Sequence, residues 1–99
     1  MSVKEIARLK VRSAQRATFV EEARTYAKIL GGDSGCHHIE MFQGVEEPDS
    51  FVFLITWDSR EAHKAFQGSD RGRQAISTIV SYLVETPATS HYETLGLPG

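Results

Sequence analysis

Phe51-Val52-Phe53-Leu54-Ile55-Thr56-Trp57 is the stretch that decides the fold of this 99-residue chain. Its aromatic and β-branched residues predict a strand. Successive side chains of a strand point to opposite faces, so Phe51, Phe53, Ile55 and Trp57 share one face and Val52, Leu54 and Thr56 share the other. Both faces are therefore apolar, and a sheet built around this strand needs a cover on each side.

Two elements are predicted before this strand. In residues 6–12, apolar Ala7, Leu9 and Val11 alternate with basic residues, which predicts a strand with one buried face. Residues 14–30 have a helical period, with a stripe formed by Phe19, Val20, Ala23, Ala27 and Leu30. Ser13 is the expected N-cap, Thr18 with Glu21 is an alternative start, and Gly31-Gly32 ends the helix.

The remaining elements surround residues 51–57. Residues 36–43 read as a strand, and residues 44–50 form a turn-rich connection. Asp58 or Ser59 caps a helix that runs to about Phe66 or Gln67 and is interrupted at Gly68. A second helical piece is expected over residues 70–83, with Ala75, Ile76, Ile79 and Leu83 along one side, and a last strand is expected over residues 91–95.

This order is the split βαβ arrangement of a ferredoxin-like α+β domain. Its four strands form one antiparallel sheet with the helices on one face. The other apolar face of residues 51–57 then has no cover within the chain, and the simplest cover is the sheet of a second copy. We therefore expect a homodimer through the sheet face, with residues 1–99 as a single domain.

Composition narrows the function classes. Hydrophobic residues make up 40% and charged residues 24% of the chain, which is typical of an ordinary globular protein. A formal net charge of −2 argues against nucleic acid as a partner, since such proteins carry a basic footprint. The longest apolar run is too short for a membrane span, and the first residues lack the apolar stretch of a signal peptide. With one cysteine, Cys36, the sequence predicts a cytoplasmic protein.

Several segments resemble the antibiotic biosynthesis monooxygenase (ABM) family, from about Ile6 to Leu95. These segments, in chain order, are residues 7–11, Gly35-Cys36 with residues 39–42, Glu47-Pro48-Asp49, residues 51–54, and Trp57-Asp58-Ser59-Arg60-Glu61-Ala62 leading to Ser69. The resemblance implies the same ferredoxin-like unit, paired sheet to sheet as a dimeric α+β barrel. It also implies that the last strand, placed here at residues 91–95, can reach onto the partner subunit.

What the resemblance implies about activity is a cofactor-independent monooxygenase of a small aromatic, quinol or polyketide-type substrate. In such relatives a base removes a substrate proton, and the electron-rich anion reacts directly with O₂. The protein supplies an apolar pocket, an acid/base group and donors that hold the anion. No cofactor is expected. The alternatives are a non-catalytic dimeric module that binds a small apolar or aromatic ligand, and a haem-binding variant.

Three histidines are candidates for the base. His63 lies beside the apolar stripe of Ala62 and Phe66, at a position that is usually aliphatic in the family; the family's frequent histidine falls at Phe66 instead. A partly exposed helix histidine is the plainer interpretation of His63. His37 and His38 are adjacent on a strand, so one is expected to face the helices and the other the dimer. They cannot chelate one metal from opposite faces, and no metal site is predicted.

Four aromatic residues are candidates for binding the substrate, namely Trp57, Phe66, Tyr82 and Phe53, with Tyr26 and His91 as further possible donors. A core role is the plainer interpretation of Trp57. Haem-degrading relatives use an asparagine, a tryptophan and a histidine; this chain has no asparagine, and the other two positions align with Phe66 and Ile76. Only a different ligand such as His63 would leave a haem role open.

Overall fold

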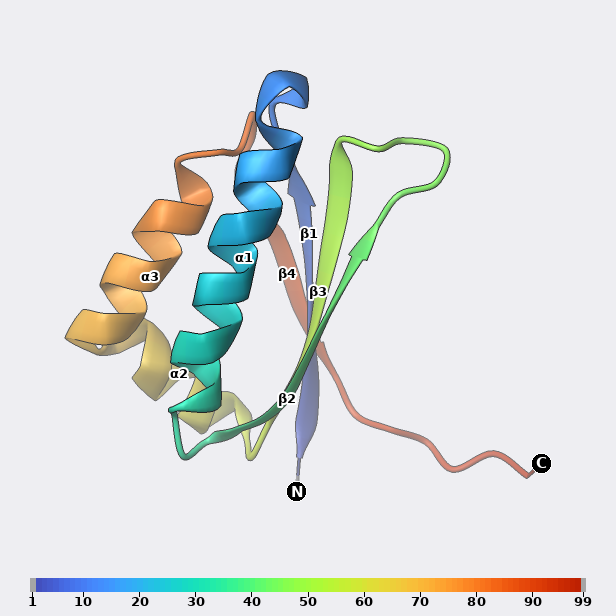
Figure 1. Ribbon diagram of the computed structural model, residues 1–99. Coiled ribbons are helices and arrows are strands. Elements are labelled where there is room, and N and C mark those ends of the chain that lie inside the picture. Colours follow the sequence, from blue (N-terminus) through green and yellow to red (C-terminus); the bar gives the residue numbers. More distant parts are fainter. Residues whose placement is uncertain (1, 99) are drawn as a thin grey trace.

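The computed structural model describes residues 2–98, and in it one antiparallel sheet carries helices on a single face (Figure 1). The elements in chain order are β1 (Val3–Lys10), η1 (Ser13–Gln15), α1 (Arg16–Gly31), β2 (Cys36–Gln43), β3 (Ser50–Trp57), α2 (Arg60–Gly68), α3 (Asp70–Val80) and β4 (Ala88–Tyr92). The strand order is β2-β3-β1-β4. This confirms the predicted ferredoxin-like α+β fold.

Strand β3 lies inside the sheet, and its two faces have different surroundings. Phe51, Phe53, Ile55 and Trp57 face the helices and are at most 3% exposed. Val52 and Leu54 lie on the helix-free face and are only half-buried, beside Ile6 and the exposed Phe42, which are their partners across the ladders. From the sequence, either face of residues 51–57 could have been the one without helices. The structure shows that it is the face with Val52 and Leu54.

Aromatic packing fixes α1 on the sheet. The Phe19 ring lies 4.9 Å from that of Phe51, and the Tyr26 ring lies 5.6 Å from that of Phe53, measured between centroids. Fully burying side chains of this size stabilises a fold by about 1.5–3 kcal/mol each. The α1 stripe predicted from the sequence is thus the surface that holds the helix layer against β3.

Some predicted boundaries were wrong, and strand pairing explains why. The last strand is β4 rather than residues 91–95, because it pairs with β1 from Lys4 opposite Tyr92 to Arg8 opposite Ala88. The first strand ends at Lys10, and Val11 forms only an isolated bridge to Leu83. That bridge requires an extended backbone at Leu83, so the second helical piece ends at Val80.

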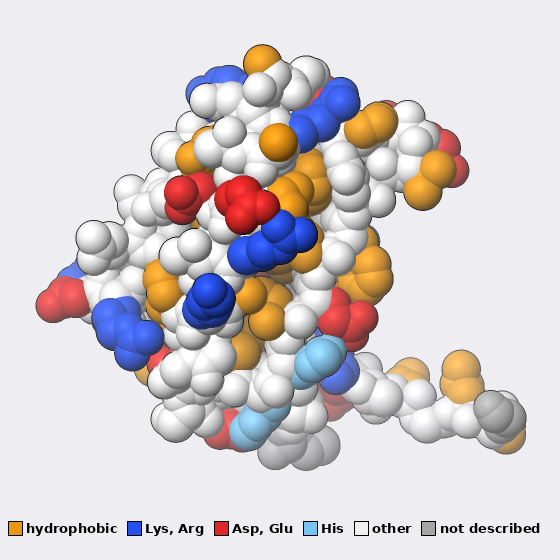
Figure 2. All heavy atoms as spheres, in the orientation of Figure 1, with side chains coloured by type: hydrophobic (Ala, Val, Ile, Leu, Met, Phe, Trp, Pro, Cys, Tyr) orange, Lys and Arg blue, Asp and Glu red, His pale blue; other side chains and the backbone are white. Residues whose placement is uncertain are grey.

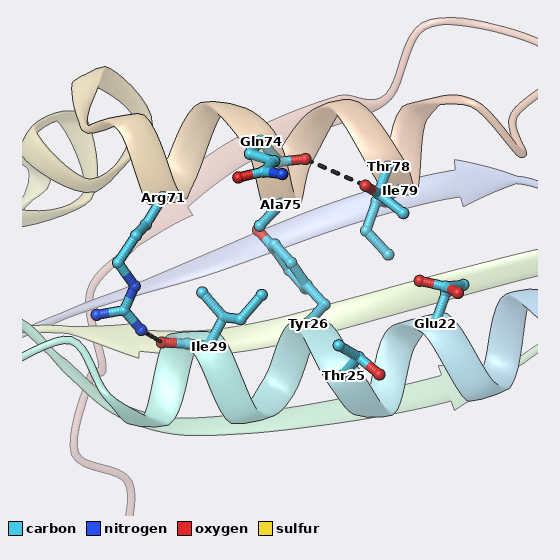
Figure 3. A pocket seen from close by; sticks show the side chains of 9 residues that line it. All are labelled: Glu22, Thr25, Tyr26, Ile29, Arg71, Gln74, Ala75, Thr78 and Ile79. Atoms are coloured by element: carbon cyan, nitrogen blue, oxygen red, sulfur yellow. Dashed lines mark hydrogen bonds between the residues drawn. The ribbon is translucent and has the colours of Figure 1, made fainter.

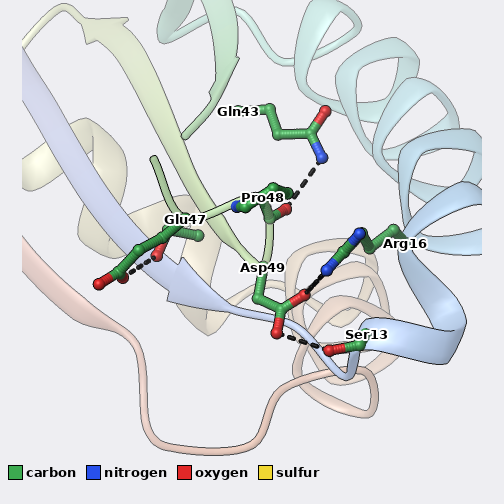
Figure 4. A network of polar contacts seen from close by, with 7 residues as sticks. Ser13, Arg16, Gln43, Glu47, Pro48 and Asp49 are labelled. Carbon is green, nitrogen blue, oxygen red and sulfur yellow. Dashed lines mark hydrogen bonds and ion pairs between the residues drawn. The ribbon is translucent and has the colours of Figure 1, made fainter. Parts of the chain in front are cut away.

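The expected N-cap at Ser13 is also wrong. Its hydroxyl donates instead to Asp49 Oδ2 at 2.6 Å, and Arg16 Nε donates to Asp49 Oδ1 at 2.6 Å (Figure 4). Helix α1 starts at Arg16 without a side-chain cap, so the Thr18 alternative is excluded as well. The hydrogen bonds from Ser13 and Arg16 lower the pKa of Asp49. This network ties the β2–β3 loop to the start of α1.

The surface shows mixed charge. On the face drawn in Figure 2, acidic and basic side chains are interspersed and hydrophobic side chains lie between them. Within residues 2–98, no helix has the length and apolar character needed to span a bilayer.

Two serines cap the broken second helix, and of the expected alternatives Asp58 and Ser59 it is Ser59 that caps the first piece. Ser59 Oγ accepts from Ala62 N at 3.0 Å, and Ser69 Oγ accepts from Gly72 N at 3.0 Å. The break brings the start of α3 against the end of α2, so that a Cβ at Gly72 would lie 1.7 Å from the carbonyl oxygen of Phe66. Only glycine fits there.

We predict that Gly72→Ala lowers the free energy of unfolding by about 2 kcal/mol or more, since overpacking against fixed backbone is not relieved by rotamer changes. Gly68→Ala is the matched control, because a Cβ at Gly68 meets nothing within 4 Å. Urea unfolding at constant m-value measures both. Equal midpoints for the two variants would contradict the close approach of α2 and α3.

Candidate functional site

A cavity of about 110 Å³ lies between the helix-facing side of the sheet and the α2–α3 pair. Its wall is mostly apolar, with Ala7 and Leu9 of β1, Phe53 of β3 and Ile76 and Ile79 of α3. The other residues that line it are Glu5, Tyr26, His63, Gln67, Val80, Pro87 and Thr89. An apolar cavity with a few titratable side chains in its wall, here Glu5, Tyr26 and His63, is typical of a binding or active site.

Glu5 is the buried carboxylate of this cavity. It lies on β1 in phase with Ala7 and Leu9, opposite Ile55 of β3 and His91 of β4, and is only 6% exposed. The indole of Trp57 donates to Glu5 Oε1 at 2.8 Å. Burial raises the pKa of Glu5, and the Trp57 hydrogen bond opposes that rise.

His63 is the buried imidazole beside it. Helix α2 places this ring against Trp57, with centroids 4.8 Å apart and planes 18° apart. His63 Nε2 lies 3.3 Å from Glu5 Oε1, and His63 Nδ1 shares a hydrogen bond of 2.7 Å with His91 Nε2. Burial, with a smaller effect of His91, lowers the pKa of His63 to about 4. Burial and the charge of Arg60 also lower the pKa of His91.

The predicted aromatic residues separate into two groups. Phe53 lines the cavity, while Trp57 and Phe66 lie behind it, with ring centroids 5.5 Å apart. Tyr82 does not line this cavity; it is half-buried and packs edge-on against Phe19 at 6.0 Å. His63 is buried rather than partly exposed, because its ring fills the space over Trp57.

His38 lies opposite Thr56 on the helix-free face, in line with half of the expectation, but His37 does not reach the cavity. The register of β2 against β3 shifts between Cys36 and His38, and this irregularity interrupts the simple alternation. His37 pairs with Asp58, and His38 Nε2 lies 3.1 Å from Glu40 Oε1. Both histidine side chains are more than half exposed, and neither lines the cavity.

Glu5 is the site residue that sequence reasoning missed. The signal was present, because Glu5 continues the alternation of Ala7, Leu9 and Val11 by two residues toward the N-terminus. Read that way, the pattern places a carboxylate on the buried face, where a charged group needs a partner. Trp57, His63 and His91 supply that partner only once β3, α2 and β4 are assembled around β1.

A second, more open hollow of about 280 Å³ lies between α1 and α3 (Figure 3). Arg71 stands at one end beside the carbonyl of Ile29, and Glu22 stands toward the other. Tyr26 and Ile79 line both this hollow and the cavity, so their side chains separate the two spaces. Within residues 2–98, no three His, Cys, Asp or Glu side chains are arranged to hold a metal ion.

The pKa of His63 predicts a pH-dependent stability. The folded protein keeps this ring neutral down to about pH 4, whereas the unfolded chain protonates it near 6.5. The unfolded state binds more protons between these values, so the free energy of unfolding falls as the pH drops from 6.5 to 4. At about 1.4 kcal/mol per pKa unit, the His63 contribution amounts to about 3 kcal/mol.

Glu5 acts in the opposite direction, because its raised pKa lets the folded protein bind the extra proton. The two contributions are separated by comparing Glu5→Gln with the double variant Glu5→Gln/His63→Gln. Urea unfolding at several pH values should show the loss between pH 6.5 and 4 in the single variant, and a flatter profile in the double variant. Parallel profiles would contradict the buried, neutral His63.

Comparisons with known proteins support both the fold and the family. A protein from Bordetella bronchiseptica, described as a candidate antibiotic biosynthesis monooxygenase, superimposes with a TM-score of 0.89 at 19% identity, covering 95% of this chain and 97% of that one. SnoaB, a cofactor-independent oxygenase from Streptomyces nogalater, superimposes with a TM-score of 0.85 at 15% identity, covering 99% and 98%. At these identities the likeness establishes the fold.

Sequence comparison establishes the family as well as the fold. The uncharacterised protein YczJ of Bacillus subtilis (strain 168) is 23% identical over 92 residues, which cover 92% of this chain and 97% of that protein. The sequence profile of the family described as antibiotic biosynthesis monooxygenase matches residues 2–78, most of the chain. With the ferredoxin-like fold already established, the chain belongs to the antibiotic biosynthesis monooxygenase (ABM) family.

Proposed function

We propose that this protein is a cofactor-independent monooxygenase that oxidises a small aromatic, quinol-type substrate in the cavity between sheet and helices. The observation that carries the proposal is the meeting of a buried carboxylate, Glu5, with a buried neutral imidazole, His63, at the wall of an apolar cavity. Membership of the ABM family and the fold shared with the oxygenase SnoaB support it.

Cavity size favours a single-ring substrate over a polycyclic one. At about 110 Å³, the cavity is well below the roughly 300–1,000 Å³ of pockets that hold drug-sized ligands. A phenol or quinol ring would lie against Phe53 and the apolar side chains of β1 and α3, with its hydroxyl toward Glu5 and His63. The apolar wall would exclude water from the anion formed there.

The chemistry balances without a further reductant. Loss of the phenolic proton gives a phenolate, which transfers an electron to O₂. The two radicals combine at a ring carbon, and the resulting peroxide anion takes back a proton to form a hydroperoxide. Loss of water from that hydroperoxide leaves a carbonyl, so that phenol plus O₂ becomes quinone plus water. The substrate supplies all four electrons, and the protein supplies an acid/base group and a dry site.

Two other functions are less well supported. A binding module without catalysis would be favoured by a pocket that no histidine reaches, but His63 lines this cavity. For haem, the remaining candidate ligand is His63, and its nitrogens face Glu5 and His91. Ligation of iron would require breaking one of those contacts in a cavity of about 110 Å³.

We predict oxygen consumption when the protein is supplied with members of a panel of quinols and anthrones, the single-ring quinols reacting faster. His63→Ala should lower turnover by about 100-fold or more, because the variant breaks up the carboxylate–imidazole pair that supplies acid/base chemistry at the cavity wall. His37→Gln and His38→Gln are the matched controls, because these side chains lie outside the cavity. An oxygen electrode measures all four proteins, and no uptake by the wild type would remove the proposed function.

We also propose a homodimer through the helix-free face of the sheet. That face carries the half-buried Val52, Leu54 and Ile6 and the 49% exposed Phe42, an apolar area left open by the single helix layer. Basic Arg8 and acidic Glu40 lie on the same face, where a twofold axis can bring opposite charges together.

Leu54→Lys should convert this dimer into a monomer, because a charge at the centre of the apolar contact is costly to bury. Ser77→Lys adds the same charge on the exposed side of α3 and should leave the dimer intact. Sedimentation velocity of the three proteins measures the change. A wild type that sediments as a monomer would contradict the sheet-to-sheet contact.

A further inference from the structure

We propose that Glu5, rather than His63, takes the proton from the substrate, and that His63 and His91 are positioning residues that hold its carboxylate in place. The inference rests on the proposed function, since it assigns roles within the same cavity. It differs from the sequence-based hypothesis, in which His63 itself was the base.

The first argument concerns the nitrogens of His63. Its Nδ1 shares the 2.7 Å hydrogen bond with His91 Nε2, and its Nε2 lies 3.3 Å from Glu5 Oε1. The ring is also stacked on Trp57, which opposes rotation toward the cavity. Neither nitrogen is therefore free to meet a ligand hydroxyl while these contacts persist.

The second argument concerns the two oxygens of Glu5. Oε1 receives the Trp57 indole N–H at 2.8 Å and faces His63, whereas Oε2 has no hydrogen-bond partner among residues 2–98. Within the same residues, every buried side-chain nitrogen or oxygen that is closed off from solvent does have a partner. Oε2 must therefore reach open space, and the space that Glu5 lines is the cavity.

The third argument concerns the charges around Glu5. The titratable groups near it are Tyr26 of α1, Cys36 of β2, His63 of α2 and His91 of β4, and Arg60 acts on His91. No lysine or arginine among the described residues forms an ion pair with Glu5. Burial raises the pKa of Glu5 although the Trp57 N–H opposes the rise, so the carboxylate is more basic than an exposed glutamate.

These contacts allow two protonation patterns, and the proposed role of Glu5 requires the following one. His91 Nε2–H donates to His63 Nδ1, which leaves the proton of His63 on Nε2, directed at Glu5 Oε1. In this pattern Glu5 is a carboxylate, and its Oε2 is directed toward the ligand. The O–H bond of the phenol breaks, its proton moves to Oε2, and the electron pair stays on the phenolate. Oε2 returns this proton to the peroxide anion that forms with O₂, which gives the hydroperoxide. As the O–O bond breaks, Oε2 takes the proton from the ring carbon that bears the peroxide, the C–H electron pair forms the carbonyl, and the departing hydroxide receives that proton as water, so Glu5 ends as it began.

The decisive variant is Glu5→Gln, which keeps the size of the side chain and removes its basicity. With a quinol that the wild type oxidises, kcat should fall by about 100-fold or more, and His37→Gln should match the wild type. Glu5→Ala should recover part of its activity when sodium formate is added, because formate can occupy the space of the missing carboxylate. A structural role alone would give no such rescue.

A second measurement needs no substrate. Nitrogen-15 NMR of the imidazoles at pH 7 should show His63 protonated on Nε2 in the wild type, and a mixture of tautomers in His91→Leu. Protonation of His63 on Nδ1 in the wild type would make Glu5 a proton donor and overturn the assignment. The assignment would also be overturned if the wild type oxidises the quinol and Glu5→Gln oxidises it at the same rate. A wild type that consumes no oxygen from any quinol overturns the proposed function itself, whatever the spectrum shows.

Discussion

The hydrogen bond from the Trp57 indole to Glu5 is the constraint on which the interior near the cavity depends. A buried carboxylate costs several kcal/mol unless it is paired or hydrogen-bonded. Strand β3 supplies Trp57, helix α2 lays His63 over that indole, and β4 brings His91 to the second imidazole nitrogen. Three separate elements therefore meet around one acid of β1, and the carboxylate is paired only when all three are in place.

The fold could be predicted from the sequence because periodicity is a local property. Alternation from Phe51 to Trp57 and the helical stripe from Phe19 to Leu30 follow from backbone geometry alone, and the structure confirms both buried faces. Boundaries were less predictable because they depend on partners: β4 starts at Ala88 since β1 offers it a ladder there, and α3 ends where Leu83 bridges to Val11.

The candidate site was harder to predict, for reasons that also lie in tertiary contacts. The sequence marks His63 as a candidate base, but the burial of its ring follows from stacking on Trp57, which helical periodicity does not encode. Strand alternation failed at His37 because of one shift in register. Glu5 was overlooked because a glutamate near the start of a chain reads as a surface residue until its strand is paired on both sides.

His91 belongs to β4, which has a neighbour on one side only, β1. Such an edge strand opens more readily than the strands within a sheet, and local opening of this kind needs far less free energy than global unfolding. Each time β4 frays, His63 loses its Nδ1 partner and Glu5 loses the arrangement that depends on it. A contact that holds the buried carboxylate in place thus lies on an edge strand, so that whatever clamps or releases the C-terminal segment also adjusts the charge at the centre of the molecule.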